Sequence, residues 1–558
     1  MERRPASLAL VTGIAASAFV LVSLFHELGH PLLWHDESET AMFASRILDY
    51  GYPKIHGERN VLYSLWHANG VGIHEPTDAY TGSPWGQYYV GALGVALGPR
   101  DDLYARTAWV RAPFALAGAA GLLWLALTAW PLFGPERAAR WTGAALYAGA
   151  LAYSVNLLLH LREARYYGLA MLAIAGTLWL WQRREREGGL SLWGESALAG
   201  GLVALFHTFH PAFGALGIAL ALRAGAESWR RHGDLHDRAR HFLRASRPLL
   251  VAAALALPAL LFFDFLDQTR GWLERFTDTR TPARNLGFVS WTLARYEFGL
   301  TALVLRVCVA AFAPGNVAPV RRRFATTLAT VVVVYAFVVA QIPFLFERYF
   351  VVLGPLVSLM AVLDGRTLWE AARGALPAGR RGLIGGLGLA SLAVALAFAA
   401  RMPEFVAHVG AFGETYRGPL DFVIPYLDAE YEDSSKLIIA TNYEGPAYMF
   451  YLGSQVTVGF YGTALERDRQ IQPDVIVPRP WPDHVALLKE LSERVPYRAK
   501  SFPVQNLPWN NNPALSPRAD HATAHRFRTA APRDGAPELV ILERRTAPNL
   551  RRRRSGPG

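Results

Sequence analysis

Cysteine and charge are both scarce in this chain of 558 residues. The only cysteine is Cys308, which excludes an intrachain disulfide, a zinc ribbon and an iron–sulfur cluster held by cysteines. Charged residues make up 18% of the chain and hydrophobic residues 52%, whereas a soluble domain carries roughly 25% charged residues. This composition argues against an ordinary soluble enzyme and against a disordered chain.

The positive charge is spread along the chain. A formal net charge of +11 would suggest nucleic-acid binding if the arginines shared one soluble face. They instead separate long apolar runs. We therefore predict no nucleic-acid partner and interpret the arginines as determinants of membrane topology.

Long apolar runs dominate residues 1–402. The first run, 5–25, reaches the roughly 20 residues that a membrane-spanning helix needs. A cleaved signal peptide is the alternative, but the run exceeds a usual signal h-region and no small-x-small site follows it. Further runs raise the expected total to about eleven transmembrane helices: 109–133, 138–158, 167–182, 192–208, 211–223, 248–264, 298–315, 325–345, 349–363 and 382–400.

Basic connectors alternate with non-basic ones. One orientation places every arginine-rich loop on the side of Met1, so the positive-inside rule predicts a multi-pass inner (plasma) membrane protein with a cytoplasmic N-terminus. The opposite, extracytoplasmic side then holds 27–108, 159–166, 209–210, 265–297, 346–348 and all residues after 401.

The composition changes after Arg401. Four short apolar segments there predict buried strands, and 481–494 has the periodicity of a helix. We expect a transmembrane domain over 1–402 that includes the first outer loop 27–108, a small extracytoplasmic α/β domain over 403–545 and a disordered basic tail over 546–558. The predicted strands are 437–440, 455–458, 474–477 and 539–542, and 503–517 is predicted to be a loop.

Ionisable and aromatic residues gather at the predicted outer ends of the helices, where such residues tend to serve a function. Arginine binds phosphate through two parallel hydrogen bonds, and a carboxylate can act as a general base. The pattern therefore predicts a site for an anionic, amphipathic ligand at the outer membrane surface. The segments concerned are Trp34–Glu39, His160–Tyr167, His207–Pro211 and Glu347–Tyr349.

Structural roles are the alternative for each of these segments. Asp36 and Glu39 fit a capping box for a helix over 37–50. Glu163 and Arg165 fit an interfacial ion pair, and His207 and His210 fit satisfied interfacial histidines. Arg348, like Arg106 and Arg111, fits a headgroup anchor.

One motif favours a different chemistry. His26-Glu27-Leu28-Gly29-His30 matches the H-E-x-x-H pattern of zinc proteases and, with Leu363-Asp364-Gly365, resembles the site-2 proteases. The predicted topology places His26 and Asp364 at opposite membrane surfaces, roughly 30 Å apart. Pro31 also disfavours helical geometry at His30. An intramembrane zinc protease is therefore a minor alternative.

Several segments together resemble the GT-C glycosyltransferases of family 39 type, which include protein O-mannosyltransferases and aminoarabinose transferases. The first-loop signature is carried by 34–53, with an Asp-Glu pair followed by an amphipathic helix that ends in glycine. Later landmarks follow in the same order: 83–98, 111–116, 163–167 and Arg348-Tyr349 with Pro355. The resemblance covers about 1–400. It departs at Ser83-Pro84-Trp85, where many members have Lys-Pro-Pro, and it does not extend to the C-terminal domain.

This resemblance implies the fold, a GT-C-type polytopic α-helical membrane protein with a small C-terminal α/β domain. It also implies a function: a polyprenyl-phosphate-linked sugar donor transfers its sugar, with inversion, to an unknown acceptor at the outer face of the bilayer. Asp36 is then expected to be the general base, with Glu37 assisting or orienting it. Arg165 and Arg348 are expected to bind the donor phosphate. Tyr166 is a weaker candidate for contact with the donor phosphate, and Glu163, His207 and His210 are candidates for substrate binding.

We predict no cofactor, although a divalent metal near Asp36, Glu37 and Glu163 is left open. The main alternative function is a transporter or flippase of a lipid-linked or polar solute. Such proteins often carry paired broken helices in two repeated halves, and no such repeat is found here. The identity of the sugar and of the acceptor does not follow from the sequence.

Overall fold

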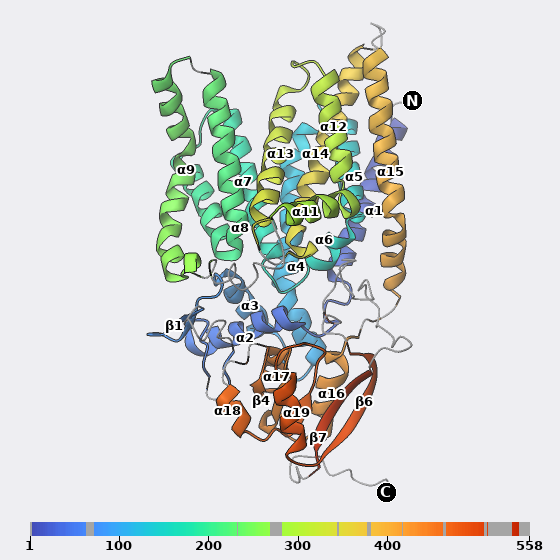
Figure 1. Cartoon of the computed structure of the whole chain (residues 1–558). Helices are drawn as coiled ribbons and strands as arrows, with labels where there is room; N and C mark the ends of the chain where they lie inside the picture. The colour runs from blue at the N-terminus through green and yellow to red at the C-terminus, as the bar shows by residue number, and fades with distance from the viewer. Residues whose placement is uncertain are drawn as a thin grey trace.

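The computed structural model describes residues 3–57, 59–62, 72–231, 233–267, 270, 282–342, 345–375, 381–413, 415, 417–460, 462, 465–506, 511 and 538–545. The predicted basic tail, 546–558, lies outside the described residues. Most of the chain forms a helical bundle in which the longest helices run in similar directions, whereas α11 (Pro282–Tyr296) lies across them (Figure 1). These helices are α1 (Arg3–Phe25), α4 (Leu103–Ala129), α5 (Arg137–Ala152), α6 (Val155–His160), α7 (Tyr167–Glu187), α8 (Leu192–Arg231), α9 (Leu235–Phe262), α11 (Pro282–Tyr296), α12 (Gly299–Phe312), α13 (Pro319–Val339), α14 (Leu353–Ala375) and α15 (Arg381–Ala411).

The bundle is that of a polytopic α-helical membrane protein. Six segments of the described residues are long and apolar enough to cross a bilayer: 7–25, 103–132, 192–230, 235–262, 319–339 and 385–411. Large apolar side chains on these segments point away from the protein, as with Leu8, Leu123 and Leu261, which are 70%, 60% and 71% exposed. Such exposure suits contact with lipid and would be unfavourable in water. The total of about eleven spans remains a prediction.

Helix α8 is broken at its centre. A straight helix of 40 residues would measure about 60 Å, twice the thickness of a hydrocarbon core. Phe209 interrupts it with extended backbone angles, φ −145° and ψ 87°, two residues before Pro211. Proline removes a helical hydrogen bond and disfavours helical geometry in the residue before it. The break falls where the sequence predicts a turn between a tight pair of helices.

The first outer loop lies between the bundle and the C-terminal domain (Figure 1). It contains α2 (His35–Tyr50), the short strands β1 (Ile73–His74) and β2 (Ala79–Tyr80), and α3 (Gly86–Leu97). Helix α2 ends at Gly51, whose φ of 84° is a left-handed conformation that glycine adopts without steric cost.

The expected capping box at the start of α2 is wrong. The helix begins at His35, its N-cap is Trp34, and no side chain caps it. The backbone amide of Ser38 donates to the carbonyl of Trp34 at 2.8 Å, which places Asp36 inside the first turn. Glu39, the presumed partner, accepts instead from the Tyr88 hydroxyl at 2.8 Å. The Asp36 side chain is therefore not engaged as an N-cap.

The C-terminal domain is built on a five-stranded mixed sheet with the order β4-β3-β5-β7-β6. β3 pairs in parallel with β4 and β5, whereas β7 is antiparallel to β5 and β6. The domain elements are α16 (Leu420–Glu430), β3 (Ile438–Thr441), α17 (Gly445–Leu452), β4 (Gln455–Val458), α18 (Leu465–Gln470), β5 (Val475–Val477), α19 (Val485–Glu493), β6 (Tyr497–Gln505) and β7 (Glu538–Arg544).

The four predicted strands and the predicted helix correspond to β3, β4, β5, β7 and α19, whereas β6 was not predicted. Most side chains at the start of β6 are exposed, so this edge strand has no apolar run to reveal it. Its last residues, including Pro503, lie in the segment that the sequence predicts to be a loop.

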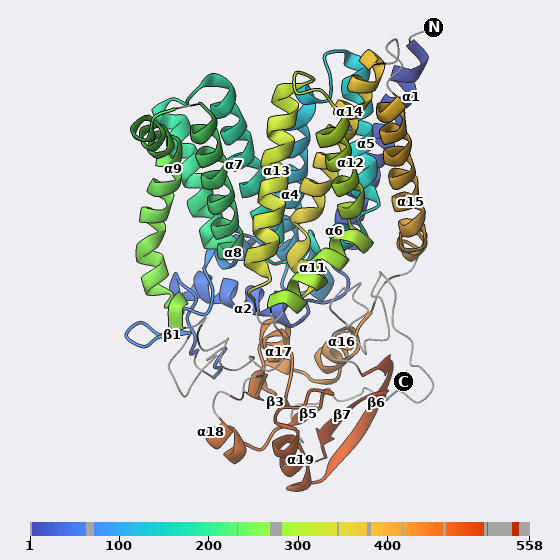
Figure 2. The same ribbon diagram turned by 45° about the horizontal axis from the view of Figure 1, so that its top comes forward.

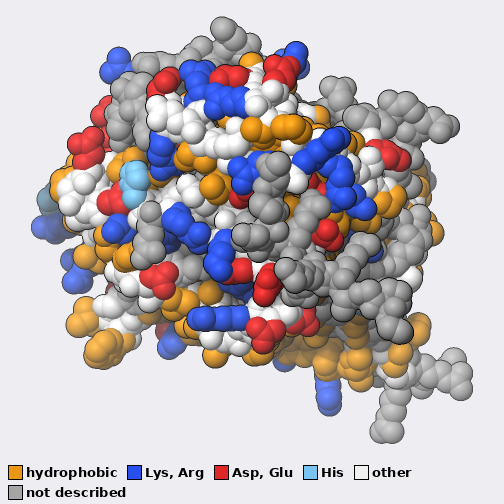
Figure 3. Space-filling model, turned by 90° about the horizontal axis from the view of Figure 1, so that it is seen from below, with side chains coloured by type: hydrophobic (Ala, Val, Ile, Leu, Met, Phe, Trp, Pro, Cys, Tyr) orange, Lys and Arg blue, Asp and Glu red, His pale blue; other side chains and the backbone are white. Residues whose placement is uncertain are grey.

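The two ends of the bundle differ. The N-terminus lies at the end away from the C-terminal domain (Figure 1; Figure 2). Seen from the domain's end, the surface carries basic and acidic side chains interspersed with apolar ones (Figure 3). This polar surface suits an aqueous compartment, in contrast to the apolar sides of the bundle.

Candidate active site

Asp36 meets two arginines from distant parts of the chain. Its Oδ2 lies 3.5 Å from Nη2 of Arg348 and 3.7 Å from Nη2 of Arg165. The Asp36 side chain is 24% exposed, whereas those of Arg165 and Arg348 are 12% and 7% exposed. The structure therefore brings together the three residues on which the predicted site depends, with the carboxylate as the most accessible of them.

Arg165 is held at the turn between α6 and α7. Its Nη1 donates to the backbone carbonyl of Asp36 at 3.2 Å and lies 3.9 Å from Oε1 of Glu39. Its guanidinium lies over the ring of Tyr166, with 5.3 Å between Cζ and the ring centroid. Its Nε is buried and has no hydrogen-bond partner among the described residues. A guanidinium in this position retains capacity to bind an anion.

Arg348 is fixed by aromatic rings. It lies in the short 3-10 helix η2 (Glu347–Phe350), with Cζ 4.7 Å from the ring centroid of Trp34 and 4.1 Å from that of Phe346. Stacking of this kind fixes a guanidinium plane while leaving its edges for hydrogen bonds. The backbone of η2 is also tethered, because Nδ2 of Asn156 donates to the carbonyl of Glu347 at 3.3 Å.

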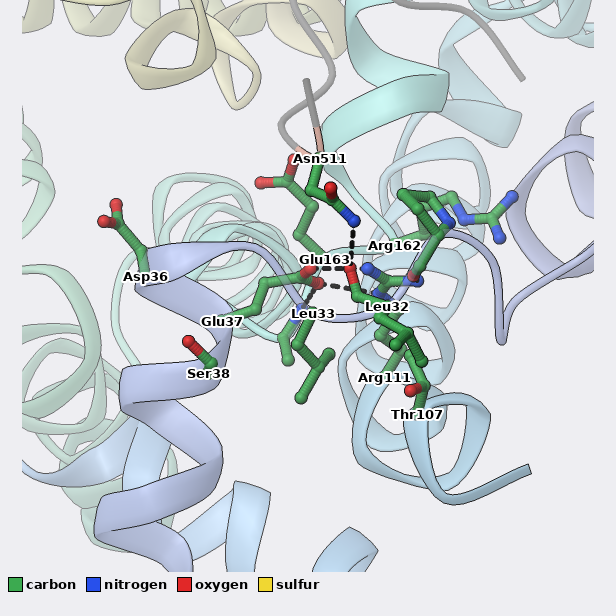
Figure 4. A network of polar contacts seen from close by, with 12 residues as sticks. Leu32, Leu33, Asp36, Glu37, Ser38, Thr107, Arg111, Arg162, Glu163 and Asn511 are labelled. Carbon is green, nitrogen blue, oxygen red and sulfur yellow. Dashed lines mark hydrogen bonds and ion pairs between the residues drawn. The ribbon is translucent and has the colours of Figure 1, made fainter. Parts of the chain in front are cut away.

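Glu37 faces the opposite way and is fully buried. It forms a two-pronged ion pair with Arg111 of α4, with Oε1 to Nε at 2.8 Å and Oε2 to Nη2 at 2.5 Å. Oε1 also accepts from the backbone amide of Ala164 at 2.8 Å. Figure 4 shows Glu37 turned into this network while Asp36 points away from it. Of the two predicted functions of Glu37, this geometry suits orienting and not direct contact with substrate.

Glu163 lies behind the site. Its Oε1 is 2.9 Å from Nδ1 of His160, and both side chains are buried. Burial, with a further contribution from the nearby charge of Glu37, raises the pKa of Glu163 well above its usual value. Burial also lowers the pKa of His160 to about 3. Both groups are therefore favoured in their neutral forms, and neither reaches the Asp36 oxygens in the structure.

Tyr166 and the break in α8 form the next part of the wall. The ring of Tyr166 stacks on Phe209, with 4.3 Å between centroids and 11° between planes. Phe209 and Trp34 lie in two of the segments predicted to form the site, although neither residue was assigned a role there. The two predicted histidines on either side of it point elsewhere: the His210 ring packs on Phe265 at 4.4 Å, and His207 lines a separate cavity.

That cavity is apolar and has a volume of about 540 Å³. It lies between α3, the broken part of α8 and the end of α9. Its lining residues are Trp85, Gly86, Tyr89, His207, Pro258, Ala259, Phe262 and Phe263. A side chain at position 86 would place its Cβ 2.5 Å from the His207 carbonyl oxygen, so glycine is needed for α3 to approach α8 here.

The H-E-x-x-H segment does not form a zinc site. His26–Gly29 form a turn after α1, and Glu27 has a φ of 48°, so the two histidines do not share a helical face. The His30 ring stacks on Tyr104 at 3.9 Å, and Asp364 is paired with Arg306 at 2.8 Å in a different part of the bundle. Within the described ranges, no group of three or more His, Cys, Asp or Glu is arranged to hold a metal ion.

No family model matches the sequence, and no curated protein matches it. Among solved structures, ArnT from Cupriavidus metallidurans bound to undecaprenyl phosphate is 14% identical, with a TM-score of 0.47 over 95% of this chain and 97% of that one. Its apo form has a TM-score of 0.44 at 14% identity over the same shares of both chains. The apo Archaeoglobus fulgidus oligosaccharyltransferase is 11% identical, with a TM-score of 0.46 over 88% of this chain and 69% of that one.

Proposed function

We propose that the chain is a membrane glycosyltransferase that moves a sugar from a polyprenyl-phosphate donor to an acceptor at the extracytoplasmic face. The observation that carries this proposal is a partly exposed carboxylate, Asp36, within 4 Å of two largely buried arginines. The topology proposed from the sequence, with the N-terminus in the cytoplasm, places this site at the outer leaflet.

Arg165 and Arg348 suit the donor phosphate. Their distances to Asp36, 3.7 and 3.5 Å, exceed the 2.7–2.9 Å of a strong charge-assisted hydrogen bond. A phosphate between them would form shorter bonds than Asp36 does. We propose that no metal or cofactor is needed, because the two guanidinium groups supply positive charge where the leaving phosphate gains negative charge.

The apolar cavity suits the lipid part of the donor. It begins at His207, two residues from Phe209, whose ring stacks on Tyr166 next to Arg165. Its lining is apolar and aromatic, so an isoprenoid chain would be bound there mainly by van der Waals packing against these side chains. A single donor would then extend from the arginines along the break in α8.

The proposed reaction is a direct displacement. Asp36 accepts the proton of an acceptor hydroxyl or amine, whose oxygen or nitrogen bonds to C1 of the sugar on the face opposite the phosphate. The bond from C1 to the phosphate oxygen breaks, and its electron pair leaves with the polyprenyl phosphate. The configuration at C1 is inverted. General-base assistance of this kind contributes about 100- to 10,000-fold to a rate.

The test uses the full-length protein in lipid nanodiscs. Undecaprenyl-phosphate-linked mannose, glucose and aminoarabinose serve as donors, a cell-envelope extract serves as the acceptor source, and release of undecaprenyl phosphate is measured. We expect release with one of these donors and about 1,000-fold slower release with Asp36→Asn. Asp49→Asn, a change of an exposed aspartate on the same helix, is the matched control and should retain activity. No release from any donor, or full activity of Asp36→Asn, would overturn the proposal.

A further inference from the structure

The C-terminal domain contacts the segment that leads into Asp36. Residues 31–34 run without regular structure into α2, and the side chains of Leu32, Leu33 and Trp34 are all buried. The extended backbone of this segment has amides and carbonyls that need hydrogen-bond partners. Where those partners come from determines what holds the start of α2 in place.

The partners come from the far end of the sequence. The backbone amide of Leu32 donates to Oδ1 of Asp421 at 2.9 Å, and Nδ2 of Asn511 donates to the carbonyl of Leu32 at 3.1 Å. The amide of Leu33 donates to the hydroxyl oxygen of Tyr451 at 3.0 Å. Two successive amides just before α2 are thus bound by side chains of the C-terminal domain that lie 389 and 418 residues further along the chain.

The two side chains are themselves fixed. Oδ2 of Asp421 accepts from the Gly418 amide at 2.8 Å and from Nδ2 of Asn511 at 2.9 Å. The Tyr451 hydroxyl lies 2.5 Å from Oγ1 of Thr107 in α4. These contacts leave Asp421 and Tyr451 little freedom to move, so they form a rigid support that joins the domain, the bundle and the segment 31–34.

A displacement of this segment would reach Asp36 directly. Trp34, next in sequence to Leu33, is both the N-cap of α2 and a stacking partner of Arg348. A rotation at Leu33 therefore changes the direction in which α2 begins and the place of the Asp36 carboxylate relative to Arg348. A misplacement of about 1 Å in a catalytic arrangement can reduce a rate by about 100-fold.

We propose that Asp421 and Tyr451 are positioning residues for Asp36, so that the C-terminal domain is a working part of the catalytic centre. The consequence for reaction rate rests on the proposed function, whereas the positioning itself does not. In this arrangement the domain is required for transfer whatever the acceptor, and loss of the domain removes all transfer and not only acceptor choice.

The test compares two losses of one buried hydroxyl from the same domain. Tyr451→Phe removes the bond to Leu33. Tyr431→Phe is the matched control, because the Tyr431 hydroxyl donates to Oε1 of Glu543 at 3.1 Å, within the C-terminal domain. Hydrogen exchange of the peptide 28–38 is followed by mass spectrometry on the full-length protein in nanodiscs. We expect at least tenfold faster exchange at the Leu33 amide in Tyr451→Phe only.

Kinetics provide the second measurement, with the donor that proved most active in the panel above. Tyr451→Phe should lower kcat about tenfold and change the donor KM by less, because Asp36 moves with α2 whereas the phosphate-binding arginines belong to other elements. Partition between acceptor and water should shift towards water, a ratio that loss of folded protein does not change. Tyr431→Phe should change none of these values.

Unchanged exchange at Leu33 in Tyr451→Phe, or equal effects of the two variants, would overturn the positioning role. Asp421→Ala should similarly accelerate exchange at Leu32. If that variant fails to fold, Tyr451→Phe still decides the matter. If no donor is active at all, the proposed function fails, and hydrogen exchange still tests the positioning role because it needs no substrate.

Discussion

The two sides of the first turn of α2 differ although they carry neighbouring acids. On one side Glu37 is completely buried and contacts Arg111 at 2.5 and 2.8 Å. On the other side Asp36 is 24% exposed, and its nearest arginine nitrogens lie at 3.5 and 3.7 Å. The first arrangement satisfies its charges fully, and the second leaves them only loosely paired.

This difference distinguishes a structural acid, Glu37, from a candidate catalytic acid, Asp36. A buried, fully bonded ion pair resists exchange of its partners, because loss of either partner leaves a charge without compensation in a dry environment. Loosely paired charges at a partly exposed position can exchange one partner for a ligand at lower cost. The helix thus uses one acid to hold α4 and the turn at Ala164 in place, and presents the other acid to substrate.

Among the variants that test this contrast, Asp36→Asn should have the largest effect. The variant keeps the shape of the side chain and removes its ability to accept a proton, so we expect transfer to fall about 1,000-fold. The thermal unfolding midpoint should stay unchanged, because the side chain is partly exposed and loosely paired. Activity in nanodiscs and calorimetry measure the two quantities. A large loss of stability would show that Asp36 is as structural as Glu37.

Glu37→Gln should have the reverse effect. The change leaves the buried Arg111 charge without an opposite charge, and we expect a loss of about 3 kcal/mol in the free energy of unfolding. The control is Glu187→Gln, which breaks an exposed pair with Arg183 at 2.9 Å and should cost less than about 1 kcal/mol. Thermal unfolding of both variants checks this expectation. Equal midpoints would remove the distinction between the two sides.

Arg348→Lys tests the loosely paired side of α2 through the arginine that is proposed to bind the donor phosphate. Lysine keeps the charge, but it loses both the two-pronged geometry and the stacking between Trp34 and Phe346. We expect kcat/KM for the donor to fall about 100-fold, with a weaker affinity for undecaprenyl phosphate. The exposed Arg183→Lys is the matched control and should change neither value. Undiminished binding would mean that Arg348 only anchors its helix.

The sequence allowed prediction of the elements with strong local patterns. Apolar runs indicated the bundle, and the turn in α8 was placed at 209–210, the short gap between two apolar runs. The strands with continuous apolar segments, such as β3 and β5, were also predicted. The edge strand β6 escaped because its side chains are mostly exposed, and the start of α2 was misplaced because backbone bonding at Trp34 overrode the capping preference of Asp36.

The residues of the site could be predicted better than their orientations and contacts. Asp36, Arg165 and Arg348 were chosen as residue types at predicted outer ends of helices, and the fold brings them together. The sequence gives no means to see that Glu37 turns towards Arg111, since its orientation depends on packing between α2 and α4. The contributions of Trp34, Phe209 and Tyr451 likewise arise from tertiary contacts, for which local patterns carry no signal.

The smallest expected effect is on the pH dependence of stability, through His35 in the first turn of α2. His35 precedes Asp36, is buried, and stacks on Tyr443 of the C-terminal domain at 5.0 Å. Burial lowers its pKa from 6.5 to about 4, so the unfolded chain binds a proton between these values and the folded chain does not. Stability therefore rises with pH from about 4 to 6.5, and we expect the His35 imidazole to account for a loss of about 2 kcal/mol in the free energy of unfolding on acidification from pH 8 to pH 5.

Thermal unfolding at both pH values should show a smaller loss of stability in His35→Phe, which keeps the stacking and cannot be protonated. An identical loss in the variant would mean that groups other than His35 cause the pH dependence.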